Sequence, residues 1–166
     1  MRLFIGIKLD SKCIKKIDNY YKFFYSENVS GNYTSLENLH LTLNFLGELD
    51  ENRITEITSI INSVKLEISE LEIIKFTRLK DMLVGEVKKT KELMDIYNDL
   101  TNKLKQRGFK INDYPFYPHI TLIRQVKGLR EFKFIDSELN VKFNFTQITL
   151  FESTRINNKL VYIPKN

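Results

Sequence analysis

HLTL at residues 40–43 and HITL at residues 119–122 are two copies of one short pattern, and together they hold both histidines of the 166-residue chain. In each copy polar and apolar residues alternate, which is typical of a β-strand with one buried face. Residues i and i+2 of a strand point to the same side, so each histidine shares a face with the threonine two positions later. The sequence therefore predicts two similar strands, each presenting an imidazole beside a hydroxyl.

The segments around these motifs repeat one order of predicted elements: a strand, a helix, a loop and a motif strand. Period-two or apolar patterns predict strands over residues 3–8, 39–46, 68–76, 82–87, 118–123, 139–151 and 159–163. Helical stripes with candidate N-caps predict helices that begin after Asp10 or Ser11, after Asp50 and after Thr90. Polar or proline-containing stretches predict loops over residues 28–38 and 112–118.

Because the two motifs lie about half a chain apart, this repeated order indicates an internal duplication. We expect an α+β fold that is bilobal and pseudo-two-fold, with two antiparallel sheets facing a central cleft and helices packed outside. Residues 1–166 would form a single domain made of these two lobes.

The composition limits the possible compartments and partners. Lys and Arg outnumber Asp and Glu by 26 to 21, and the net charge of +5 favours anionic partners such as RNA, nucleotides or other phosphates. Cys13 is the single cysteine, which rules out an internal disulfide, fits a reducing cytoplasm and is best explained as a core or boundary residue. The apolar run at the N-terminus is too short to span a membrane and has no cleavage pattern, so we expect a soluble, cytoplasmic protein.

Two histidines suit acid–base chemistry on a phosphate. When a cyclic phosphodiester is hydrolysed, a base takes a proton from the attacking water, and an acid gives one to the departing sugar oxygen on the opposite side of phosphorus. An imidazole with a pKa of about 6.5 can serve either task near neutral pH. We therefore predict His40 and His119 as the catalytic pair, with the hydroxyls of Thr42 and Thr121 binding the phosphate. The sequence has no HExxH or HxH spacing and no glycine-rich phosphate loop, so we expect no metal and no cofactor.

The motifs and their flanks resemble a known superfamily. ENLHLTLNFLGE at residues 37–48, PFYPHITLIR at 115–124, RLFIGI at 2–7 and LFES at 150–153 are similar to the two-histidine (2H) phosphoesterases. The resemblance is strongest to the LigT-like RNA 2′,3′-cyclic phosphodiesterases, also called 2′-5′ RNA ligases.

The resemblance implies a bilobal fold whose motif strands line a central cleft. It also implies hydrolysis of a 2′,3′-cyclic phosphate to a 2′-phosphate, with His40 as proton donor to the leaving 3′ oxygen and His119 as the acceptor that activates water. The expected partners are RNA ends or nucleotides that carry 2′,3′-cyclic phosphate. We expect the chain to act as a monomer, away from membranes.

Three further residues are candidates for the site. Relatives often carry an arginine just before the proline of the second motif, where this chain has Tyr117, and Arg124 is a candidate to supply the missing anion contact. Strict alternation would turn Arg124 away from the face of His119, unless the strand ends or bulges there. Tyr33 and Phe116 lie in the loops before the motif strands and are candidates for stacking on a base.

Two other functions stay open at this stage. The same site could act on 2′-5′-linked oligonucleotides, including reversible ligation, and a panel of 2′-5′ and 3′-5′ substrates would separate these activities. The chain could also be an RNA-binding module with little catalysis. Tight, salt-sensitive RNA binding that does not depend on the histidines would favour that function.

Overall fold

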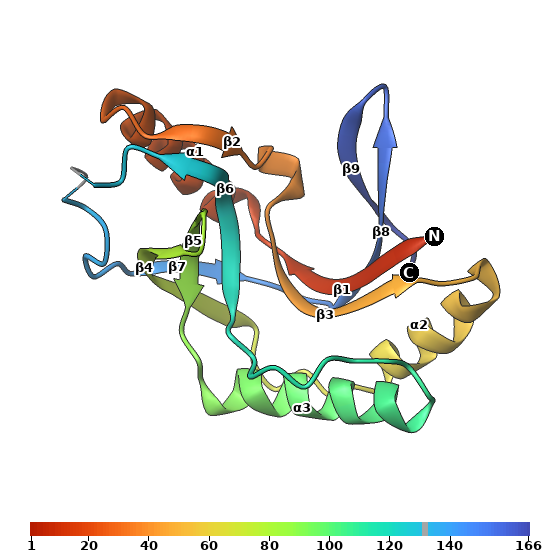
Figure 1. The fold of residues 1–166 in the computed structure, drawn as a ribbon. Helices are drawn as coiled ribbons and strands as arrows, with labels where there is room; N and C mark the ends of the chain where they lie inside the picture. Colours follow the sequence, from red (N-terminus) through yellow and green to blue (C-terminus); the bar gives the residue numbers. More distant parts are fainter. Residues whose placement is uncertain (131–132) are drawn as a thin grey trace.

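The computed structural model describes residues 1–130 and 133–166, which form two antiparallel sheets with helices on their outer faces (Figure 1). The first sheet has the order β3-β1-β8-β9, with strands β1 (Arg2–Lys8), β3 (His40–Glu48), β8 (Thr149–Ile156) and β9 (Lys159–Pro164). The second sheet has the order β2-β6-β5-β4-β7, with strands β2 (Ser30–Tyr33), β4 (Glu70–Leu79), β5 (Met82–Val87), β6 (His119–Lys127) and β7 (Val141–Asn144). The predicted α+β class with two antiparallel sheets is confirmed.

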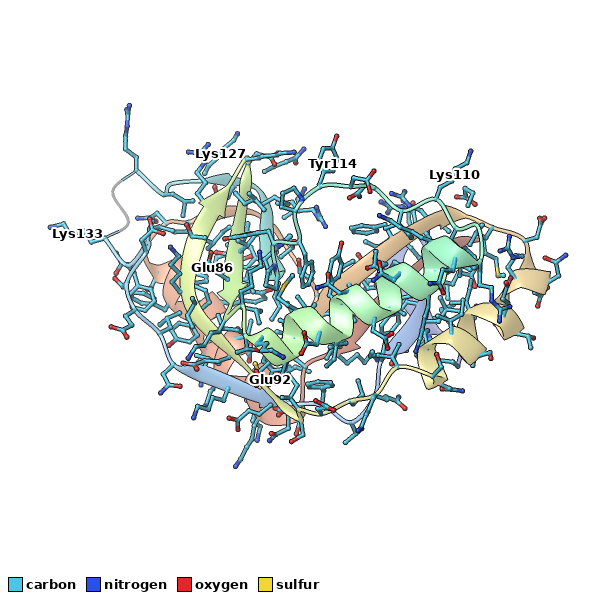
Figure 2. All side chains as sticks on the ribbon, turned by 90° about the horizontal axis from the view of Figure 1, so that it is seen from below. Glu86, Glu92, Lys110, Tyr114, Lys127 and Lys133 are labelled. Atoms are coloured by element: carbon cyan, nitrogen blue, oxygen red, sulfur yellow. The ribbon has the colours of Figure 1, made fainter. Side chains whose placement is uncertain are left out.

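The α-helices of the described residues are α1 (Ser11–Ser26), α2 (Ile54–Asn62) and α3 (Lys91–Gln106). α1 packs on the second sheet, where the ring of Phe24 lies 5.3 Å from that of Phe76 on β4. α2 and α3 lie side by side, as Figure 2 shows from below. The Asn44 amide on β3 donates a hydrogen bond to the Thr101 hydroxyl on α3 at 3.1 Å, so α3 packs against the first sheet. None of the described helices is long and apolar enough to cross a membrane.

Side-chain caps set where α1 and α3 begin. Asp10 Oδ1 accepts a hydrogen bond from the backbone N–H of Cys13 at 2.8 Å, so Asp10 rather than Ser11 caps α1. Thr90 caps α3 in the same way at 3.2 Å, which confirms that predicted cap. Cys13 is fully buried, in agreement with its predicted core position. Asp50 makes no capping hydrogen bond through its side chain and precedes a short 3₁₀ turn, η2 (Glu51–Arg53), before α2 begins.

The predicted loop over residues 28–38 contains a short strand and a turn, so that prediction is wrong in part. β2 pairs with β6, and a 3₁₀ turn follows as η1 (Leu36–Asn38). Periodicity does not reveal β2, because it has only four residues and they do not alternate between polar and apolar. The pairing is supported by a hydrogen bond from the Asn32 amide to the Gln125 side chain at 2.9 Å, and by Gly31, where a Cβ would collide with the β6 backbone.

The predicted strand over residues 139–151 is two strands in different sheets. β7 ends at Asn144 on the edge of the second sheet, and β8 begins at Thr149 in the first. Between them the chain crosses from sheet to sheet, and Phe145 and Ile148 are buried at 6% and 3% exposure. Because Phe145 and Ile148 are buried, apolar residues continue through the crossover, although Thr146 and Gln147 are exposed, and this hides the crossover from a periodicity argument.

The structure repeats a strand–helix–strand unit around each motif. β1, α1 and β3 form the first unit, β5, α3 and β6 form the second, and the two strands of each unit pair antiparallel. The two sheets are nevertheless not the two halves of the chain, because β8 and β9 complete the first sheet while β2 joins the second. The motif strands β3 and β6 therefore belong to different sheets, and they contact each other.

Asp10 joins a helix to a sheet, and we expect Asp10→Ala to lower the free energy of unfolding by about 2 kcal/mol. The variant loses the cap of α1 and also the charged acceptor of the Asn144 N–H on β7, which Asp10 Oδ2 binds at 2.6 Å. Urea unfolding followed by circular dichroism measures the change. Asp18→Ala is the control, because Asp18 lies on the same helix in an exposed 3.7 Å ion pair with Lys22 and should cost less than about 0.5 kcal/mol. Equal losses in the two variants would contradict the role of Asp10.

Candidate active site

The two motif strands place their polar residues around one cavity. The apolar residues of both motifs are buried at 0% to 4% exposure: Leu41, Leu43, Ile120 and Leu122. The polar residues of both motifs line one cavity of about 710 Å³: His40, Thr42, His119 and Thr121. The predicted alternation is confirmed, and four of the predicted site residues meet in one place.

His40 is held by hydrogen bonds and enclosed by aromatic rings. Its Nδ1 lies 2.7 Å from the backbone carbonyl of Asn38, and its Nε2 lies 2.9 Å from the hydroxyl of Thr42. The rings of Phe4 and Tyr162 lie 4.9 Å and 5.0 Å from the imidazole, measured between centroids, and Tyr162 meets it edge-on. The Asn38 amide also donates to a backbone carbonyl of β9 at 3.0 Å, so the β8–β9 hairpin is tied to the segment that holds His40.

His119 is held through the same nitrogen but is more open. Its Nδ1 lies 2.7 Å from the carbonyl of Tyr117, which is again two residues earlier. A carbonyl oxygen can only accept, so the Nδ1 of each histidine carries a hydrogen. Nε2 is then the ring nitrogen that can accept a proton in the neutral form and donate one in the charged form. Both histidines therefore present the same nitrogen for proton transfer.

The surroundings of His40 favour its neutral form. Burial lowers the pKa of His40 from its ordinary value of 6.5, and the charges of Arg124 and His119 lower it further, against the Asn38 carbonyl bond that raises it. The cavity therefore carries positive charge that a bound anion would compensate. Within residues 1–130 and 133–166, no group of three His, Cys, Asp or Glu side chains is placed to hold a metal ion.

A bulge in β6 brings Arg124 to the cavity. The register between β5 and β6 shifts at Leu122, and the consecutive residues Leu122 and Ile123 are both buried. The shift reverses the alternation, so Arg124 lines the same cavity as His119 rather than the opposite face of the strand. The side chain of Arg124 therefore does not follow the strict alternation of a regular strand, and the alternative of a bulge in this strand is confirmed.

β3 has the same irregularity, and it brings a residue to the cavity that the sequence argument missed. The register between β1 and β3 shifts at Leu43, and both Leu43 and Asn44 are buried. Phe45 then lines the cavity with its side chain 63% exposed, five residues after His40, just as Arg124 lies five residues after His119. Applying the bulge argument to both motifs would have identified Phe45.

The two candidates for base stacking lie in different surroundings. Tyr33 lines a smaller cavity of about 150 Å³ that Arg124 also lines, and its ring stacks on Tyr25 at 4.5 Å. Phe116 is not among the described residues that line either cavity, and its ring stacks on Tyr97 of α3 at 4.0 Å. The structure therefore brings Tyr33 to the edge of the site and uses Phe116 in packing.

Two imidazoles, two hydroxyls and a guanidinium around one cavity define a site for acid–base chemistry on an anionic ester. Comparisons with known proteins agree with this class. Residues 84–162 match the family described as LigT like Phosphoesterase. The RNA 2′,3′-cyclic phosphodiesterase of Thermotoga maritima is 30% identical over 131 residues, which cover 75% of this chain and 70% of that protein. The chain belongs to the LigT-like phosphoesterase family.

Further relatives match over almost the full length. The RNA 2′,3′-cyclic phosphodiesterase of Methanocaldococcus jannaschii is 26% identical over 179 aligned positions, covering 98% of this chain and 96% of that protein. The crystal structure of Escherichia coli LigT complexed with 3′-AMP superposes with a TM-score of 0.83 at 24% identity, covering 99% of this chain and 95% of that one. Both sheets therefore belong to the shared fold.

The positive charge beside His40 predicts how this histidine titrates. We expect Arg124→Gln to raise the pKa of His40 toward 6.5, because it removes a charge that disfavours the imidazolium. Inorganic phosphate added to the native protein should also raise it, since an anion favours the charged ring. NMR titration of the two histidine rings measures both shifts, and His40→Asn assigns the signals. Lys110→Gln removes an exposed charge beyond the end of α3 and serves as the control. An unchanged pKa in Arg124→Gln would contradict the described proximity.

Proposed function

We propose that the protein hydrolyses 2′,3′-cyclic phosphates at RNA ends or on nucleotides, without a metal ion, and leaves a 2′-phosphate. The observation that carries this proposal is the convergence of both histidines on one cavity, each with Nδ1 fixed and with the threonine of its own motif lining the same cavity. The activity in the names of the Thermotoga maritima and Methanocaldococcus jannaschii relatives supports the same reaction.

In the proposed step a water oxygen attacks phosphorus while the bond from phosphorus to the 3′ oxygen breaks. His119 Nε2 accepts the proton that the water loses. His40, in its charged form, gives its Nε2 proton to the leaving 3′ oxygen, so the protein as a whole neither gains nor loses a proton. The phosphate stays on the 2′ oxygen, which is the product that the family resemblance implies.

In the proposed reaction the remaining polar residues of the cavity stabilise the negative charge of the phosphate and transfer no proton. The hydroxyls of Thr42 and Thr121 donate hydrogen bonds to the equatorial phosphate oxygens, where negative charge grows in the transition state. Arg124, brought to the cavity by the β6 bulge, offsets that charge with its guanidinium. Tyr33 at the edge of the site remains a candidate for contact with a base.

We also propose that residues 1–166 act as one domain, as a monomer and in the cytoplasm. A single hydrophobic core that includes residues of both sheets supports the first point. A single, fully buried cysteine fits a reducing compartment.

The assay that tests the reaction offers a nucleoside 2′,3′-cyclic phosphate in the presence of EDTA. We expect turnover to a 2′-phosphate, and we expect His40→Asn and His119→Asn each to reduce kcat by about 10²–10⁴-fold, because each removes one proton-transfer group. The double variant should lose much less than the product of the two factors, since the groups act as a unit. The profile of kcat/KM against pH should be bell-shaped, because one histidine must be neutral and the other charged.

Lys110→Asn is the matched control, and circular dichroism checks that each variant is folded. Full activity in either histidine variant, or activity abolished by EDTA in the native protein, would contradict the mechanism. Cleavage or joining of 2′-5′ linkages without hydrolysis of the cyclic phosphate would assign the site to the ligase-type reaction instead. RNA binding that neither histidine variant weakens, without turnover, would indicate a binding module.

A further inference from the structure

The cavity around the histidines is much larger than a phosphate group requires. Its volume of about 710 Å³ lies within the range of roughly 300–1,000 Å³ that holds an entire drug-sized ligand. The histidines lie toward one end of β1 and β3, since His40 pairs with Lys8 at the end of β1. The cavity continues along β1 to the opposite end of that strand, where Arg2 lines it.

Two arginines lie along this extension in line with the reacting centre. Arg2 is two residues from Phe4, whose ring packs 4.9 Å from that of His40. On β8, Ser153 pairs with Arg2, and Arg155 lies two residues further in the same direction. A strand advances about 3.3 Å per residue, so Arg2 and Arg155 follow Phe4 at steps of about 7 Å along the sheet.

Both guanidiniums are available to a ligand. Among the described residues, no carboxylate lies within ion-pair distance of Arg2 or Arg155. Glu48 faces Arg2 in the register of the strands, but its carboxylate lies 3.5 Å from the N-terminal ammonium. Arg155 donates a hydrogen bond to the Asn158 carbonyl in the β8–β9 turn at 3.0 Å, which orients its side chain and leaves other N–H groups free to donate.

A second, smaller cavity shares His40, Thr121 and Arg124 with the first and differs from it in charge. Among the described residues that line the 150 Å³ cavity beside Tyr33, the Lys or Arg side chain is that of Arg124. Regularly spaced cations occur instead along β1 and β8, with the exposed ring of Phe45 bordering the same cavity. Cations that follow a backbone, next to an aromatic surface for bases, are the two features of a site for single-stranded nucleic acid.

We propose that, in an RNA substrate, the nucleotides before the reacting phosphate lie along β1 and β8. Arg2 contacts the first phosphate before the cyclic one, Arg155 contacts the next, and Phe45 offers a surface for a base. This inference rests on the proposed function and adds to it the path of the strand and the two residues that bind its phosphates.

The test compares uridine 2′,3′-cyclic phosphate with a uridine trinucleotide that ends in the same group. The trinucleotide has two more phosphates, so we expect the native protein to favour it in kcat/KM by roughly tenfold or more. The double variant Arg2→Gln/Arg155→Gln should lose roughly that factor on the trinucleotide and change by less than about twofold on the mononucleotide, which has no phosphate to reach the arginines. When log kcat/KM of the double variant on the trinucleotide is plotted against log salt concentration, the slope should be shallower than that of the native protein by about 1.4. This corresponds to about 0.7 for each lost phosphate contact.

Lys110→Gln/Lys133→Gln is the matched control, because it removes two charges that lie on the outer surface in Figure 2. We expect this control to keep the preference for the trinucleotide. Equal kcat/KM for the two substrates in the native protein, or equal losses on both in the arginine variant, would overturn the inference while the proposed function stands.

Absence of turnover on both substrates would instead mean that the proposed function fails, and binding then tests the path of the strand. The probe is a labelled uridine trinucleotide that ends in a 2′-phosphate, measured by fluorescence anisotropy at two salt concentrations. Weaker binding with a smaller salt slope in the arginine variant supports the path. Binding equal to that of the native protein overturns it.

Discussion

Burial of four aliphatic side chains fixes the direction of both imidazoles. Leu41 and Leu43 on β3, and Ile120 and Leu122 on β6, are almost fully buried, and each contributes about 1.5–3 kcal/mol of hydrophobic stabilisation. A one-residue slip of either strand would turn those side chains into the cleft and the histidine into the core. The chemistry of the site is therefore secured by residues that take no part in it, because exchanging the two faces would cost several kcal/mol.

The two bulges decide what else reaches the cavity. A regular strand presents every second residue to one face. Each motif would therefore supply a histidine, a threonine and the residue two positions after the threonine. Because the alternation reverses after the threonine, β6 supplies Arg124 and β3 supplies Phe45. Two strands with nearly the same motif thus give the cavity a cationic position in one wall and an aromatic one in the other.

The local parts of the fold can be predicted from the sequence, whereas contacts between distant segments cannot. The helix caps at Asp10 and Thr90 and the alternation of the motif strands depend on neighbouring residues, and all of these were predictable. β2 depends on the edge of β6, and residues 139–151 divide because a crossover that buries Phe145 and Ile148 resembles a strand. No local pattern marks either feature.

The residues of the site also differ in whether the sequence alone predicts them. The histidines and threonines repeat in the sequence, so the pattern alone identifies them as a set. The aromatic residues around His40 come from both ends of the chain, Phe4 on β1 and Tyr162 on β9, and their contact with the imidazole depends on sheet order. Arg124 and Phe45 reach the cavity through register shifts, and the sequence offers a bulge as one alternative without deciding between it and strict alternation.

The enclosure of His40 makes the two histidines unequal, although their motifs are alike. Burial lowers the pKa of His40, and a bound anion would raise it again by offsetting the charges of Arg124 and His119. The proposed reaction uses His40 in its charged form, so binding of the anionic substrate would itself favour the protonated donor. The more open His119 is the better place to accept a proton from water, since water reaches it from the solvent. In the proposed reaction, the enclosure of His40 by aromatic rings therefore couples its protonation to substrate binding, whereas His119 has a more open surrounding.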